Sequence, residues 1–129
     1  MSGRPRPPTR TMPSNSAPSK SAQAALRDIL HQIDLATEFT RGFTAATFKQ
    51  DLRTIYAVTR CLEIISEASR RLPDALKARH PDIAWKQMAG AGNVYRHDYE
   101  DVAAQFVWDT VLRALPPLEA ALEGEIDRS

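Results

Sequence analysis

Four side chains between residues 93 and 99 have the chemistry and the spacing of a catalytic group. Asn93 and His97 are four residues apart, which would place them on one face of a helix, and Arg96 and Tyr99 flank His97. An imidazole, with an ordinary pKa of about 6.5, can accept or donate a proton near neutral pH. A guanidinium can stabilise the charge that develops on a phosphoryl group. Together they could cleave RNA without a metal, with a base taking the proton of the ribose 2′-hydroxyl. A polar cap at a helix end is the alternative interpretation.

The sequence offers no competing catalytic or metal-binding motif. It lacks HExxH, CxxC, a Gly-rich phosphate loop and a GxSxG turn. The pair His97-Asp98 is similar to the metal-binding pair of phosphohydrolases, but the other ligands of that chemistry are missing, so we expect neither a metal nor another cofactor. Cys61 is the single cysteine, which excludes an internal disulfide, and its apolar neighbours indicate a structural role.

A helical period dominates the chain from Ala22 onward, and no segment alternates with the period of a strand. The apolar stripe of the first helix comprises Leu26, Ile29, Leu30, Ile33 and Phe39. We expect helices over residues 22–42, from Thr47 as a cap to Pro73, over 82–95 and over 101–123, with a short element over 74–79. Pro116 and Pro117 should kink or break the last of these helices. The sequence therefore predicts an all-α, up-and-down bundle of four to five helices.

The last predicted helix is apolar on more than one side. A wide stripe comprises Val107, Trp108, Val111, Leu112 and Leu115. Val102 and Phe106 face away from it, and a helix with two apolar sides favours a homodimer interface, although a wide core stripe is the alternative.

Gly90 and Gly92 weaken the predicted third helix, because glycine costs about 1 kcal/mol relative to alanine in a helix interior. We expect the close approach of another helix to compensate for this cost. The close approach of a ligand to the backbone is the alternative.

Composition separates a tail from a folded body. Residues 1–20 hold five of the nine prolines and four basic residues without an acid, which predicts a disordered tail or a basic arm, and Met12 could be a second start. Residues 21–129 form the predicted helical domain and carry 13 basic and 16 acidic residues, so a nucleic-acid contact must be local.

No apolar run is long enough to span a membrane, and the single cysteine fits a reducing, cytoplasmic compartment.

Several segments together resemble the HepT-like branch of the HEPN superfamily, and the resemblance covers roughly residues 22–122. They are Ile83–Tyr99, Val107-Trp108, Leu115–Leu118 and Leu62–Ala68, where Ser66 replaces the usual glycine. The resemblance implies a dimeric helical bundle. Many members of the branch are toxins whose Arg-x(4–6)-His-x-Tyr motif forms a ribonuclease site in the dimer cleft. Their usual partner is a minimal nucleotidyltransferase antitoxin, which adds AMP to the motif tyrosine.

Position by position, the resemblance makes His97 the motif histidine and Tyr99 the AMP acceptor. The motif arginine would precede Asn93, but Gly92 stands there, and Arg96 is the expected substitute. The implied function is a metal-independent endoribonuclease acting on RNA. The alternative is a catalytically inactive nucleotide- or partner-binding bundle that has lost this arginine.

The second predicted helix carries charged residues opposite its core stripe. Arg53, Arg60, Glu67 and Arg71 share this face, and Glu67 and Arg71 have the spacing of an ion pair within a helix. The face is either simply solvated or a phosphate-binding wall beside the cleft.

Overall fold

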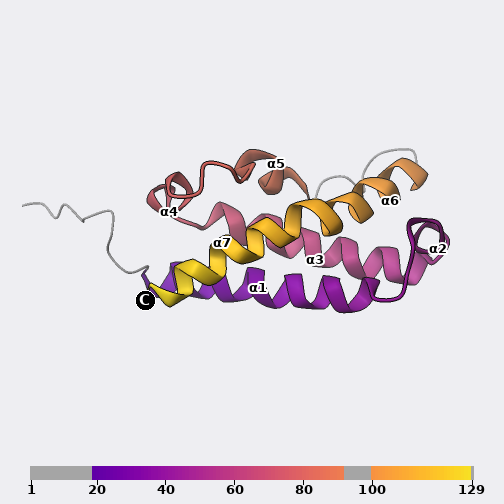
Figure 1. Cartoon of the computed structure of the whole chain (residues 1–129), viewed down its shortest axis with the longest axis horizontal. Coiled ribbons are helices and arrows are strands. Elements are labelled where there is room, and N and C mark those ends of the chain that lie inside the picture. Colours follow the sequence, from indigo (N-terminus) through magenta and orange to yellow (C-terminus); the bar gives the residue numbers. More distant parts are fainter. Residues whose placement is uncertain (1–18, 92–99, 129) are drawn as a thin grey trace, which may run out of the picture.

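The computed structural model describes residues 19–91 and 100–128, and all regular structure in these ranges is helical (Figure 1). The elements are α1 (Lys20–Thr40), α2 (Ala45–Lys49), α3 (Leu52–Arg70), α4 (Asp74–Ala78), α5 (Trp85–Gly90), α6 (Glu100–Asp109), a π-helical turn (Thr110–Ala114) and α7 (Leu115–Asp127). The expected all-α fold is confirmed. Of the predicted tail, only Ser19 and Lys20 lie in the described ranges, where they begin α1.

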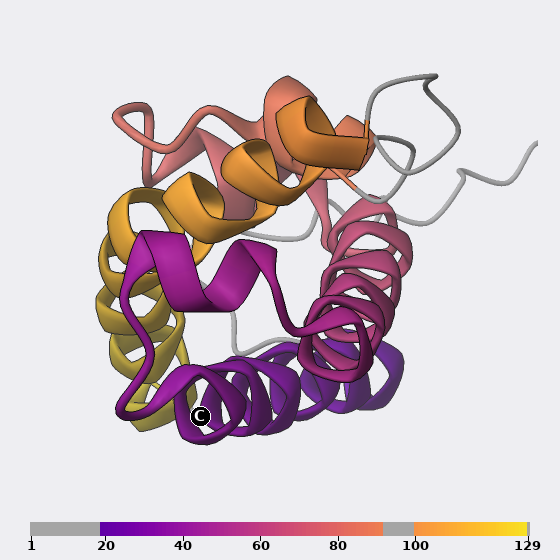
Figure 2. The same cartoon turned by 90° about the vertical axis from the view of Figure 1, so that its right-hand side faces the viewer.

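The long helices surround one core, as the view along the bundle shows (Figure 2). Helix α1 packs along α3 and α7, α5 lies against α3, and α2 covers one end against α3 and α6. Buried aliphatic side chains from all the long helices fill the centre, and Phe48 of α2 packs against Trp108 with ring centroids 5.2 Å apart. The short helices therefore complete the core at its edges.

Helix α1 follows the predicted stripe except at its end. Ser19 accepts a hydrogen bond from the backbone of Ala22, which caps the helix. Gly42 has a φ of 83°, a conformation that glycine adopts without strain, and this turn ends the helix where the sequence predicted. Phe39, which was expected in the core, is 37% exposed, because the buried face at this end of α1 passes through Ala36 and Thr40 instead.

The predicted second helix is two helices, α2 and α3, so the expectation that Thr47 caps a single long helix was wrong. Thr44 is the N-cap of α2, and Thr47 is its partner in a reciprocal capping box. Asp51 then caps α3 by accepting a hydrogen bond of 3.0 Å from the backbone of Thr54. The two N-caps lie within eight residues of each other, so the chain turns between α2 and α3. Leu52 is exposed at the start of α3.

The predicted third helix is shorter than expected within the described residues. The segment 81–84 forms a turn, and α5 begins only at Trp85. The indole of Trp85 donates to the carbonyls of Lys77 (3.2 Å) and His80 (3.0 Å), which fixes this turn under α4. Helix α5 ends at Gly90, and residues 92–95 of the prediction lie outside the described ranges.

The chain stays helical from α6 through α7, because a π-helical turn accommodates the two prolines (Figure 1). Pro116 and Pro117 have no N–H to donate and would clash with the carbonyls four residues earlier in an α-helix. At this point the Leu115 N–H donates to the carbonyl of Thr110, five residues back, which widens the turn. Leu112, expected in the core stripe, is 53% exposed, whereas Val111 and Leu115 are buried, so the buried stripe is narrower here than predicted.

Candidate functional site

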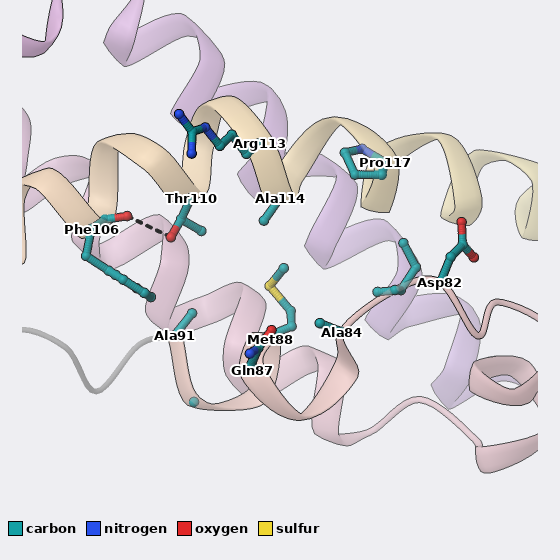
Figure 3. A pocket seen from close by; sticks show the side chains of 12 residues that line it. Asp82, Ala84, Gln87, Met88, Ala91, Phe106, Thr110, Arg113, Ala114 and Pro117 are labelled. Carbon is teal, nitrogen blue, oxygen red and sulfur yellow. Dashed lines mark hydrogen bonds between the residues drawn. The ribbon is translucent and has the colours of Figure 1, made fainter.

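A cavity of about 630 Å³ lies between α5 and the helix that runs from α6 into α7 (Figure 3). Its lining comprises Asp82, Ile83, Ala84, Gln87, Met88, Gly90 and Ala91 on one side and Phe106, Thr110, Arg113, Ala114 and Pro117 on the other. In Figure 3, the side chain of Phe106 extends toward Ala91, and Met88 extends toward Ala114. The cavity is therefore mostly apolar, with charged groups at its edges.

The π-helical turn shapes one wall of this cavity. Thr110 and Arg113 both belong to the turn and line the cavity. The hydroxyl of Thr110 donates to the carbonyl of Phe106 at 2.8 Å, so it bonds to its own helix instead of facing the cavity unpaired (Figure 3). Arg113 is exposed at the rim, and Figure 3 shows its guanidinium directed away from α5. Local π-turns are frequent at functional sites, and this one places a cation beside the cavity.

Two side chains of α3 hold the end of α5. The carbonyl of Ala89 accepts a short hydrogen bond from the hydroxyl of Ser66, which is buried. It also accepts a hydrogen bond of 2.6 Å from Nη2 of Arg70, an exposed residue at the end of α3. The last turn of a helix leaves carbonyls without partners inside the helix, and these donors satisfy one of them. They fix the backbone just before residues 92–99.

A buried carboxylate holds the other side of the α4–α5 segment. Glu125 of α7 is 2% exposed and accepts hydrogen bonds from Arg79 at 3.0 and 2.7 Å. Nε2 of His80 lies 2.7 Å from the same carboxylate, and Arg128 lies 3.6 Å away. The hydrogen bonds from Arg79 lower the pKa of Glu125 below its ordinary value, burial opposes this change, and His80 adds to it. The carboxylate is therefore ionised at neutral pH and ties α7 to the loop before α5.

The predicted catalytic residues Asn93, Arg96, His97 and Tyr99 lie outside the described ranges, as does Gly92. The described structure contains the backbone immediately before them, since Ala91 and Gly90 line the cavity. Their proposed roles thus remain predictions from the sequence.

The charged face of α3 differs in part from the prediction. Arg53, Arg60 and Glu67 are exposed as expected, but none of them lines the cavity. Nη1 of Arg60 lies 3.2 Å from Glu63. The expected pair between Glu67 and Arg71 was wrong, because Nη2 of Arg71 lies 3.2 Å from Asp28 of α1 instead. Packing of α1 against α3 brings this carboxylate within reach, and sequence spacing within one helix could not show it.

Gly90 has a different environment from the one that we favoured. A Cβ atom placed there would meet no neighbouring atom within 4 Å, so close approach of another helix does not explain the glycine. The residue is exposed and lines the cavity, which leaves its backbone open to a ligand. Because Gly90 ends α5, its conformational cost is also smaller than that of a glycine in a helix interior.

The thiol of Cys61 is buried, which suits it poorly to act as a nucleophile. Burial raises the pKa of Cys61 to about 11, so the thiolate that would act as a nucleophile is scarce at neutral pH. Within the described ranges, no three His, Cys, Asp or Glu side chains gather closely enough to hold a metal ion. The same ranges contain no helix that is both long and apolar enough to cross a membrane.

Sequence reasoning missed Arg70 and Arg113, and it assigned no contact to Ser66. The only signal was the serine at a position where the resembled family carries glycine. The partners of Ser66 and Arg70 lie 23 and 19 residues away in the chain, so only the packing of α5 against α3 brings them together.

The described structure is a helical bundle with a cavity between α5 and the helix that runs from α6 into α7, and a comparison with known families gives its class. The chain belongs to the HepT-like ribonuclease family, whose model, described as ribonuclease HepT-like, matches residues 29–124. This match includes the whole of the predicted catalytic segment and α3, α5 and α6.

Individual relatives cover most of the chain. A protein of Thermococcus cleftensis named probable ribonuclease HepT is 38% identical over 104 residues, which are 81% of this chain and 94% of the relative. A Methanocaldococcus jannaschii protein named putative RNase is 32% identical over 106 residues, 82% of this chain and 88% of the relative. A protein of Caldanaerobacter subterraneus subsp. tengcongensis, also named putative RNase, is 32% identical over 100 residues, which are 78% of this chain and 89% of the relative. No solved structure matches the chain.

Proposed function

We propose that this protein is a metal-independent endoribonuclease and the toxin of a toxin–antitoxin pair. Membership in the HepT-like family carries the proposal, because the matched range includes the motif residues and several relatives are named as ribonucleases. The cavity beside Gly90 and Ala91 supports it, since it provides a concave surface at the point where the chain enters the motif.

The proposed reaction uses His97 as general base or acid. A base removes the proton of a ribose 2′-hydroxyl, the oxygen attacks the adjacent phosphorus, and the bond to the 5′-oxygen breaks as that oxygen gains a proton. The guanidinium of Arg96 stabilises the negative charge on the phosphorus centre, and Asn93 and Tyr99 contact the substrate. Arg53, Arg60 and Glu67 are candidates for contacts to more distant parts of the RNA.

RNA cleavage by the purified protein in the presence of a chelator tests this proposal. We expect His97→Ala to abolish cleavage and growth inhibition while it leaves the helical circular dichroism unchanged. His31→Ala is the matched control, because His31 is exposed on α1 and outside the motif. Full activity in His97→Ala would contradict the assigned role.

A second candidate function follows from Gly92, which occupies the position of the motif arginine. In this alternative the protein is a catalytically inactive bundle that binds a nucleotide or a partner protein. A wild-type protein that neither cuts RNA nor slows growth when expressed alone would favour this alternative over the ribonuclease.

The proposed regulation is the transfer of AMP to Tyr99 by a minimal nucleotidyltransferase antitoxin. The tyrosine oxygen would bond to the α-phosphorus of ATP with release of pyrophosphate, which places a phosphate beside Arg96 and His97. Intact-mass measurement after coexpression with the transferase tests this step. We expect modification to be lost in Tyr99→Phe and retained in Tyr56→Phe, which changes an exposed tyrosine of α3. Unchanged modification of Tyr99→Phe would place the acceptor elsewhere.

We also propose that the protein forms a homodimer in the cytoplasm. Val102, Phe106 and Leu112 are large apolar side chains on or beside α6, and they are 64%, 40% and 53% exposed. Their burial between two copies would be favourable. We expect light scattering to show a dimer and Phe106→Asp to shift it to a monomer, whereas Leu52→Asp, at an exposed position of α3, leaves the dimer intact. A wild-type monomer at micromolar concentration would contradict the proposal.

A further inference from the structure

Arg70 presents a positive charge beside the end of α5. Its Nη2 atom donates to the Ala89 carbonyl at 2.6 Å, while the residue as a whole is exposed. No carboxylate of the described residues forms an ion pair with it, in contrast to Arg60 and Arg71, which pair with Glu63 and Asp28. The charge on Arg70 is thus not neutralised within the described structure.

This guanidinium contacts the backbone three residues before the position that lacks the family's arginine. Ala89 precedes Gly92 by three residues, and three residues of fully extended chain span at most about 11 Å. The chain from Ala89, which Arg70 contacts, to residue 92 is therefore at most about 11 Å long.

The Ala89 carbonyl would keep a hydrogen-bond donor without Arg70, because Ser66 bonds to the same carbonyl. A carbonyl oxygen has two lone pairs, so it accepts both hydrogen bonds, and either donor alone satisfies it. A guanidinium has five N–H donors, and the described contact uses one. The remaining donors have the planar arrangement that binds two oxygens of a phosphate at once.

We propose that Arg70 binds a phosphate of the RNA substrate, so that α3 supplies a guanidinium where position 92 has glycine. The inference rests on the proposed ribonuclease function. Arg96 remains the candidate guanidinium within the motif, and Arg70 acts in addition to it. The serine at position 66 holds the end of α5, which leaves Arg70 available to the substrate.

Cleavage kinetics of three variants test the inference. We expect Arg70→Ala to lower kcat/KM on the order of a hundredfold, the usual effect of losing a donor to a developing phosphate charge. Arg70→Lys should regain part of the loss, since it keeps the charge without the planar arrangement. Arg41→Ala is the matched control and should cleave as the wild type does, because it removes the same charge from an exposed position at the end of α1, where the partner is Glu38.

The salt dependence of RNA binding separates a phosphate contact from a structural role. RNA binding is measured in an inactive His97→Ala background. Each phosphate contact to a single strand contributes about 0.7 to the slope of log affinity against log salt. We expect Arg70→Ala to reduce that slope by about this amount. Ser66→Ala should lower the melting temperature but leave the slope unchanged.

Two results would overturn the inference while the ribonuclease proposal stands. One is cleavage at the wild-type rate by Arg70→Ala, and the other is an equal loss of activity in Ser66→Ala and Arg70→Ala with unchanged salt slopes. A wild-type protein that does not cleave RNA at all would instead overturn the proposed function.

Discussion

The substitution Glu125→Gln removes the buried charge that joins α7 to the α4–α5 segment, and it should destabilise the fold markedly. The amide keeps the volume of the side chain but leaves Arg79 and His80 without their anion. Removal of one partner from a buried ion pair usually costs about 3–5 kcal/mol. Because the side chain of Arg79 is 24% exposed, water can hydrate part of the charge left behind, and we expect about 2–3 kcal/mol.

Thermal unfolding followed by circular dichroism measures this loss. An unfolding entropy of about 2.1 cal/mol/K per residue, applied to a chain of this size, converts the expected loss into a fall in Tm of roughly 10 °C. Glu123→Gln is the control, because Glu123 is exposed on the same helix and its substitution should change the stability by less than about 0.5 kcal/mol. A Tm for Glu125→Gln within about 2 °C of the wild type would refute the reasoning.

The pH dependence of the same comparison gives an independent check. The folded-state pKa of Glu125 is lowered, chiefly by the hydrogen bonds from Arg79. The stabilisation is therefore fully present above the ordinary glutamate pKa of about 4.3 and is lost as the pH falls through the lower folded-state value. We expect the difference in unfolding free energy between the wild type and Glu125→Gln to be constant near neutral pH and to shrink in acid. A difference that grows on acidification would contradict this assignment.

One further substitution tests the site, and the reactivity of the buried cysteine tests the core. Gly90→Ala should raise the unfolding free energy by up to about 1 kcal/mol, because a Cβ there meets no neighbour and φ is not positive. The same substitution should weaken RNA binding if the substrate approaches this backbone. A lower melting temperature for Gly90→Ala would show that the position is more crowded. Cys61, with a pKa of about 11, should react with a disulfide reagent at pH 8 far more slowly in the native protein than in denaturant. Equal rates in the two states would mean that the thiol is open to solvent in the native protein.

Features that depend on near neighbours in the chain could be predicted from the sequence. The stripe that includes Leu26, Ile29 and Ile33 repeats with the helical period, so it predicted α1, and the same period along the rest of the chain predicted the all-α fold. Gly42 and Pro73 ended helices where expected, since their restrictions act within one turn. Several segments together, chiefly Ile83–Tyr99 and Leu62–Ala68, were sufficient to suggest the family, to which the chain belongs. The roles of these residues stay predictions.

The tertiary structure decided the rest, because the decisive partners are far apart in the chain. Glu125 and Arg79 are 46 residues apart, and Arg70 and Ala89 are 19 apart, so no local pattern encodes their contacts. Leu112 is exposed although Val111 and Leu115 are buried, because the packing of the other helices sets how wide a face of this helix they cover. A residue's type fixes which hydrogen bonds and charges it can offer, whereas the packing of the helices determines which group receives them.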